Sequence, residues 1–509
     1  MLKPHQPVAG VFGAPPPLLA GRIWDHLIPG LALVCVLLSV AVFVRRGQAA
    51  IQAGTTAPGV AVTSGYEEES LFALWKAVHH QPVYTDATRL PFAASYFNWL
   101  FYHAYAFPVR AAVQVTGDSG LPVAGRLLTA IGALAGATIL FMMSHRVLAG
   151  QPLVAAALSA FVFFGPLVGW WAHTVRPDLW ALVLETGALA VLLAGYRRHP
   201  LGTAALVALL CYGAWSFKQT YVLGLGAALL FLLFRRQWRP AGLLAVVSIG
   251  LWLATFLLLG PDYRAAFLHT ATTNLYSPAM GLRNLGDMLV KSSPLWLLAA
   301  AGLSRSGRPA GRAATPLADD TRLLGLLGLL VALPLSFAAS CKLGAASNYH
   351  FTTMVMVSLL AASLLATAGS RRLLVPGLLA AAALQLLALL GHAGRTNLSG
   401  QTASLSAIWQ VWQAQPEPRF SVLTNLNLPW VNAGSPPLVV AFNYYLERAD
   451  GRSFERGGLG GLINAGSFQT LLLPADTQQK YDGGSLRHYR RGPTVGDLTV
   501  FHRDSTTTR

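Results

Sequence analysis

Residues 153–171 read LVAAALSAFVFFGPLVGWW, an uncharged stretch as long as a membrane-spanning helix. A helix of about 20 residues crosses the ~30 Å hydrocarbon core of a bilayer. A short polar loop, AHTVRPD (residues 172–178), follows, and a second apolar block begins at Leu179. This stretch predicts two helices that cross a membrane and meet at a polar loop.

The whole chain repeats this pattern. Of its 509 residues, 54% are hydrophobic and 11% are charged, and the mean hydropathy is +0.50. Because soluble domains carry roughly a quarter charged residues, a soluble enzyme is excluded. We predict an all-α polytopic membrane bundle of eleven spans, although counts of ten to twelve also fit. The spans are 28–44, 127–143, 153–171, 179–194, 201–217, 221–234, 241–259, 288–303, 323–339, 351–368 and 373–390.

Arginine accounts for most of the net charge of +17. Most arginines lie at the ends of apolar blocks, which indicates membrane lipids rather than nucleic acid as partners. Clusters containing Arg146, Arg197, Arg235, Arg308 and Arg371 occupy alternate loops, so the positive-inside rule predicts that these loops and the amino terminus are cytoplasmic. The arginine pair at 45–46 breaks the pattern.

Two long segments then face outward, residues 45–126 and the tail from 392. The tail has apolar runs of strand length at 420–423, 438–442, 468–473 and 498–501. We therefore predict a transmembrane domain over 1–391 and a small α/β extracytoplasmic domain over 392–509. Residues 401–413 have apolar side chains at helical spacing, which predicts an amphipathic connector on the membrane surface.

The first outer segment contains a helix start at Ser64–Glu67. Glu67 shares a face with Leu71 and Leu74, which places a carboxylate on an apolar stripe. The S-x-x-E spacing also fits a capping box, in which Glu67 only accepts from a backbone amide. Taken alone, the capping role is favoured.

Other polar residues stand where apolar blocks begin or end. Arg176 and Asp178 lie in the loop quoted above, where charges often face a cavity but also suit an ordinary helix start. Lys218 is either a snorkelling lysine or a point charge for phosphate. Asn348, Tyr349 and His350 begin the tenth span, as interfacial and capping residues or as part of a site. The predicted topology brings these groups, with Glu67 and Asp86, to one outer face.

At these positions the sequence resembles the type C glycosyltransferases of the cell envelope, especially the bacterial mannosyltransferase, galacturonosyltransferase and aminoarabinose transferase groups. The tail also resembles the outer domain of that family. Tyr66 and His80 depart from its pattern, at positions where aspartate and glycine are usual. The matching positions are Glu67, Leu71 and Trp75; Gln81, Pro82, Tyr84 and Asp86; Arg126–Leu128; Arg176–Asp178; Lys218–Thr220; and Asn348 with Tyr349.

The resemblance implies a multi-pass enzyme of the bacterial inner (plasma) membrane that takes a sugar from a polyprenyl-phosphate donor. The acceptor is a hydroxyl of a lipid or glycan on the outer face, and the transfer proceeds with inversion. Glu67 or Asp178 is the general base, with Glu68 as the alternative to Glu67, and either Glu67 or Asp178 is alternatively a ligand of Mg²⁺ or Mn²⁺. The substrate-binding residues are Tyr84, Asp86, Arg176, Lys218, Gln219, Asn348, Tyr349 and His350.

Two other functions fit much of this pattern. A transporter or flippase for lipid-linked sugars would place its binding groups near the membrane midplane. The spans are expected to be nearly free of ionisable groups at their centres, which favours an enzyme at the surface. A glycan polymerase or ligase would differ from the first reading only in its donor.

Overall fold

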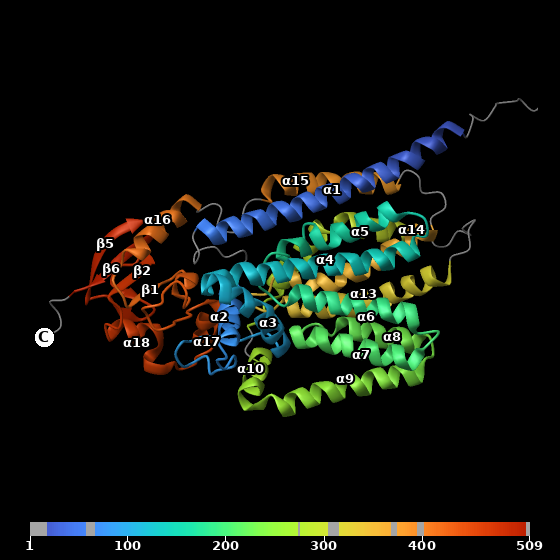
Figure 1. Cartoon of the computed structure of the whole chain (residues 1–509). Helices are drawn as coiled ribbons and strands as arrows, with labels where there is room; N and C mark the ends of the chain where they lie inside the picture. Colours follow the sequence, from blue (N-terminus) through green and yellow to red (C-terminus); the bar gives the residue numbers. More distant parts are fainter. Residues whose placement is uncertain are drawn as a thin grey trace, which may run out of the picture.

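In this computed structural model the chain forms a helical bundle with a smaller α/β part at one end (Figure 1). The structure describes residues 18–56, 67–272, 275–303, 315–367, 374–393 and 402–504. Ser64 and Tyr66 lie outside these ranges, so the predicted capping box is only half described. The α/β part is formed by the tail and contains the strands β1–β6, whose bounds are given below.

Each of the eleven predicted spans contains a helix, and the chain is a multi-pass membrane protein. Among the described residues, eight helices are long and apolar enough to cross a membrane, and three apolar helices are shorter. The long ones are α1 (Leu18–Thr56), α4 (Leu121–Val147), α6 (Asp178–Gly195), α7 (Pro200–Phe217), α9 (Trp238–Leu258), α13 (Pro316–Ser340), α14 (Phe351–Thr367) and α15 (Leu374–His392). The shorter ones are α5 (Pro152–Phe164), α8 (Leu223–Phe234) and α12 (Ser293–Leu303).

Two predicted spans are interrupted. The block at 153–171 is helical only as far as Phe164, because proline at 166 restricts Gly165 and cannot donate a helix hydrogen bond. A 3₁₀ turn, η2 (Val168–Trp171), completes the block. The block at 288–303 is divided between α11 (Pro278–Lys291) and α12, which has Pro294 in its first turn.

The first outer segment forms α2 (Glu67–Val78) and α3 (Trp99–Thr116). By composition alone, the aromatic residues of 92–115 would suit a membrane surface. Instead Phe101, Tyr102 and Tyr105 are buried against the bundle, because α3 packs between α2, α4 and α7. A further helix, α10 (Gly260–Thr272), follows α9 at the same end of the bundle (Figure 1).

The tail is built on a four-stranded sheet of order β1-β2-β6-β5. Its strands are β1 (Arg419–Ser421), β2 (Thr470–Pro474), β5 (Tyr489–Val495) and β6 (Leu498–Arg503), and only β1 and β2 are parallel. Two short strands, β3 (Lys480–Tyr481) and β4 (Gly484–Ser485), form a hairpin. The helices are α16 (Thr402–Gln413), α17 (Phe442–Ala449) and α18 (Gly458–Asn464).

One predicted strand is absent from the described tail. Residues 438–441 do not join the sheet; Val439 N donates instead to Pro91 O (2.8 Å) in the first outer segment. The amphipathic helix at 402–413 is present, yet Ile408 and Trp412 are buried in the tail's own core, and the Arg419 guanidinium covers Trp412 at 4.8 Å. Its apolar face therefore does not lie on the membrane.

The tail and the first outer segment share their cores. Phe72 and Ala93 pack with Trp412 and Val500, and Phe92 packs with Phe420. Backbone bonds join them too, as Glu455 N donates to Thr88 O (2.8 Å). These contacts hold α2 and α17 together at the end of the bundle.

Candidate functional site at the end of the bundle

A polar cavity of about 330 Å³ lies where the helical bundle meets the tail. Its wall comes from the loop before α6, the end of α7, the loop after α13 and the start of α17. Three basic side chains line it, those of Arg176, Lys218 and Lys342. Gln219, Tyr349 and Asn443 add polar groups, and Phe97 and Tyr276 add aromatic surface. The cavity can thus accept an anion that carries polar hydroxyl groups.

Asp178 holds two residues of the basic wall, which consists of Arg176, Lys218 and Lys342, by hydrogen bonds from outside the cavity. It is fully buried and accepts from Lys218 Nζ (2.6 Å) and Asn348 Nδ2 (2.7 Å) at Oδ1, and from Arg176 Nε (3.3 Å) at Oδ2. The structure thus brings together Arg176, Asp178, Lys218 and Asn348. Asp178 itself does not line the cavity, so its charge orients the two cations.

Aromatic rings fix the cations from the sides. The Arg176 guanidinium lies 4.8 Å from the Trp171 ring centre and 5.2 Å from that of Phe97, and Lys218 Nζ lies 4.8 Å from that of Tyr349. Such contacts are stronger where water is excluded. Burial, with a smaller contribution from the charge of Lys218, lowers the pKa of Lys342 to about 8. An anion in the cavity would relieve this crowding of positive charge.

Glu67 contacts the loop at 172–178, which carries Arg176. Its carboxylate forms a two-point pair with Arg126, with distances of 3.0 Å to Nε and 2.9 Å to Nη2, and both side chains are buried. Oε1 also accepts from the backbone N of Val175 (2.9 Å). Glu67 therefore fixes the backbone next to Arg176, and its acceptor positions face protein donors.

The next two glutamates have different surroundings. Burial is the main cause that raises the pKa of Glu68 to about 7; the charge of Glu67 acts in the same direction, and the backbone amide of Glu68 and the charge of Arg176 act against it. Burial is also the main cause that raises the pKa of Glu69 to about 8, with the charge of Glu68 in the same direction and the hydrogen bond from Asn443 against it. Glu69 accepts from Nδ2 of Asn443, a cavity residue on α17. Neither glutamate lines the cavity, but the charge of Arg176 acts on both, and Glu69 contacts a residue of the cavity wall.

The remaining predicted residues differ in their relation to the cavity. Gln219 lines it, donates to Tyr96 O (2.8 Å), and leaves Oε1 buried without a hydrogen-bond partner among the described residues. Tyr84, Asp86 and His350 do not line it. Tyr84 donates to Phe97 O (3.0 Å), and Asp86 accepts from the Thr88 amide (2.9 Å). His350 is buried, and within the described chain neither ring nitrogen has a partner.

Several polar residues at or near the site do not stand out in the sequence as candidates. Lys342 is one of six lysines in the chain, and that scarcity was the available signal. Asn443 reaches the cavity only because the tail folds back onto α2, which no local pattern reveals. Glu185 is an exception to the span centres that were expected to be nearly free of ionisable groups: it is buried within α6, where it accepts from Gly224 N (2.5 Å) and Thr352 Oγ1.

A divalent cation does not fit the two acids suggested for it. Glu67 is saturated by Arg126 and Val175 N, and Asp178 by Lys218, Asn348 and Arg176. In the described ranges no three metal-ligating side chains of His, Cys, Asp or Glu gather.

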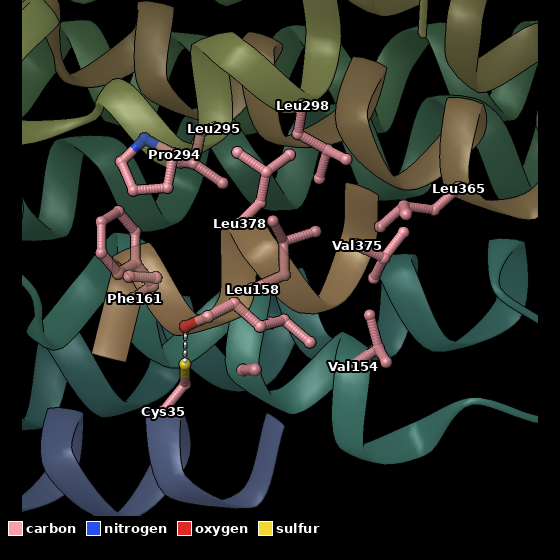
Figure 2. Close-up of a pocket in the computed structure, with 13 residues that line it drawn as sticks. Cys35, Val154, Leu158, Phe161, Pro294, Leu295, Leu298, Leu365, Val375 and Leu378 are labelled. Atoms are coloured by element: carbon pink, nitrogen blue, oxygen red, sulfur yellow. Dashed lines mark hydrogen bonds between the residues drawn. The ribbon is translucent and has the colours of Figure 1, made fainter. Parts of the chain in front are cut away.

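A second hollow, between α1, α5, α12, α14 and α15, is of a different kind (Figure 2). It holds about 50 Å³ and is lined by aliphatic and aromatic side chains such as Leu158, Phe161 and Leu378. Its one sulfur group, Cys35 Sγ, lies 3.2 Å from Leu379 O (Figure 2). This hollow suits hydrocarbon and lacks the charges that sugar or phosphate would need.

Comparisons with known proteins give a likeness of fold. No protein-family model matches the chain, and no curated protein matches its sequence. The apo oligosaccharyltransferase of Archaeoglobus fulgidus aligns with a TM-score of 0.53 and 11% identity, over 87% of this chain and 69% of that one. Its complex with zinc and sulfate gives 0.51 and 12%, over 93% and 73%.

A third structure is the same organism's oligosaccharyltransferase AglB with an inhibitory peptide and a dolichol-phosphate. Its alignment has a TM-score of 0.49 and 12% identity, and it covers 82% of this chain but only 65% of that protein. The two structures with the higher scores confirm the predicted architecture of a helical membrane bundle with a C-terminal mixed sheet. The chain thus has the fold of an archaeal oligosaccharyltransferase.

Proposed function

We propose that the chain is a membrane glycosyltransferase that moves a sugar from a polyprenyl-phosphate donor to an acceptor hydroxyl. One observation carries this proposal: three basic side chains, Arg176, Lys218 and Lys342, line one cavity beside titratable carboxyls. The fold and the sequence resemblance to type C glycosyltransferases support it.

The basic wall would bind the phosphate of the donor. When the bond between the anomeric carbon and the phosphate oxygen breaks, the electron pair stays on the phosphate, whose negative charge increases. Arg176, Lys218 and Lys342 would stabilise that charge, and they are held in place before the reaction by Asp178 and the aromatic rings. Gln219 Oε1 would accept a hydrogen bond from a sugar hydroxyl, since it has no other described partner.

A carboxylate would remove the proton of the acceptor hydroxyl as its oxygen attacks the anomeric carbon with inversion. We assign this role to Glu68 rather than to Glu67 or Asp178. Glu67 and Asp178 each accept from buried bases, whereas the pKa of Glu68 is raised by burial to about 7, the range in which a general base works well. Glu67 and Asp178 then act as positioning residues for Arg176.

The test uses membranes that contain the chain, incubated with a panel of polyprenyl phosphosugars and candidate lipid or glycan acceptors. We expect one donor to give a glycosylated product. Lys342→Met should lower kcat/KM for that donor about 10- to 100-fold, because a charge-assisted contact to phosphate is lost. Lys291→Met is the matched control, since Lys291 pairs with Asp287 on α11, away from the cavity.

A positioning role for Glu67 and a catalytic role for Glu68 can be distinguished by the stability of the protein when each residue is replaced. Glu67→Gln leaves Arg126 buried without its carboxylate and should destabilise the protein by about 3–5 kcal/mol. Glu68→Gln should lower turnover with little change in thermal stability. If Lys342→Met transferred sugar normally, or if the chain moved a labelled donor across vesicles without forming product, the proposal would be wrong.

A further inference from the structure

Another polar cavity, of about 770 Å³, lies at the end of the bundle away from the tail. It is formed where α4 and α6 end and where α13 begins. The tail lies at the opposite end of these helices (Figure 1), so this cavity is separate from the candidate site. Its wall has a basic side and an apolar side.

The basic side consists of Arg146, Arg197 and Arg198. The acid that lines the cavity, Asp320, is buried and already matched: it accepts from Tyr196 (2.6 Å) and Arg197 (2.5 Å) and pairs with Arg235. Arg146 and Arg198 are exposed, and in the described part of the chain no carboxylate forms an ion pair with either. The cavity therefore keeps a net positive charge.

The apolar side comes from the last turns of α4 and α6. Ile139, Met142, Leu193 and Ala194 line it, and Met142 and Ala194 are exposed to the surroundings of the bundle. A soluble anion would use only the arginines and leave this surface uncovered. An amphiphile with an anionic head would match both sides at once.

We propose that this cavity binds one anionic glycerophospholipid. Its phosphate lies between Arg146 and Arg198, and the first part of an acyl chain follows Met142 and Leu193. Arginines at helix ends commonly touch headgroups without selectivity. Here a half-open recess between three helices adds a defined shape, which distinguishes one bound lipid from general attraction to the membrane surface.

Native mass spectrometry of the purified protein in detergent micelles tests the proposal with added phosphatidylglycerol or phosphatidylcholine. We expect phosphatidylglycerol to bind at least about 10-fold more tightly. The double variant Arg146→Gln/Arg198→Gln should weaken phosphatidylglycerol binding by about 10- to 30-fold, with phosphatidylcholine unchanged. Arg236→Gln/Arg239→Gln is the matched control, because these arginines follow α8 near the same end but do not line the cavity.

A further variant separates a lipid from a free anion. Ala194→Trp fills the apolar side and should weaken phosphatidylglycerol binding without affecting binding of inorganic phosphate. Equal binding of the two lipids to the unchanged protein would overturn the proposal, whatever the variants do. Inorganic phosphate that displaced phosphatidylglycerol at equal concentration, with Ala194→Trp without effect, would overturn it as well.

Discussion

Glu67 and Glu68 are neighbours on α2, but their electrostatic surroundings differ. Successive side chains of a helix point about 100° apart. The Arg126 guanidinium, which pairs with the Glu67 carboxylate, therefore does not pair with Glu68. Pairing with Arg126 fixes the position of the first carboxylate. Burial without such a pair leaves the second able to exchange a proton near neutral pH.

The pH dependence of transfer follows from this difference. A carboxyl whose pKa is about 7 is protonated below that pH, so the rate should fall as pH drops through about 7 and should level off above it. Glu68→Gln should lower the rate by about two to four orders of magnitude and abolish this limb of the profile. Initial rates between pH 5 and 9 test this.

The control for that measurement is Asp262→Asn, at an exposed position on α10. It should leave both the rate and the limb unchanged. A limb near pH 7 that persisted in Glu68→Gln would assign the titration to another group.

Part of the site could be predicted residue by residue. Arg176, Lys218, Gln219 and Tyr349 line the cavity, and each stands out in the sequence as a polar residue at the end of an apolar block. Lys342 also follows an apolar block and is one of only six lysines, but only tertiary packing shows that the loop after α13 lies at the cavity.

At the scale of elements, the bilayer makes helices predictable and their packing less so. Every predicted span contains a helix because backbone groups in hydrocarbon must bond internally. The helix break at Gly165 was not predicted, because the apolar run hides the restriction that the following proline imposes. The strand predicted at 438–442 was wrong, because this segment bonds to Pro91 instead of the sheet. The polar edge strand β5 carries no apolar run that would reveal it.

Close packing of α4 against α5 gives a prediction for one glycine. A Cβ at Gly136 would lie 2.1 Å from Cε1 of Phe163, so the two helices touch where only hydrogen fits. Gly136→Val should destabilise the protein by about 1–3 kcal/mol. The unfolding midpoint in detergent measures this.

Gly250→Val on α9 is the matched control, because nothing lies within 4 Å of a Cβ at that position. It should leave the midpoint unchanged. Equal midpoints for Gly136→Val and Gly250→Val would mean that α4 and α5 can separate without loss.

At the scale of the molecule, the orientation in the membrane can be tested directly. The arginine clusters predict that a reporter inserted near Arg308 reads cytoplasmic and that one fused behind β6 reads extracytoplasmic. The opposite placement of the tail and of the ends of α4 and α6 supports this expectation (Figure 1). Both reporters on one side would contradict the eleven-span topology.

The shared core of the tail and the first outer segment determines when the protein can become active during its synthesis. Phe72 and Phe92 pack with residues that the ribosome adds more than 300 positions later, such as Phe420 and Val500. At about 5–20 residues per second, α2 waits on the order of tens of seconds for its partners. Nascent chains that stop before β6 would carry every helix of the bundle, yet the acids and the cavity would not be assembled.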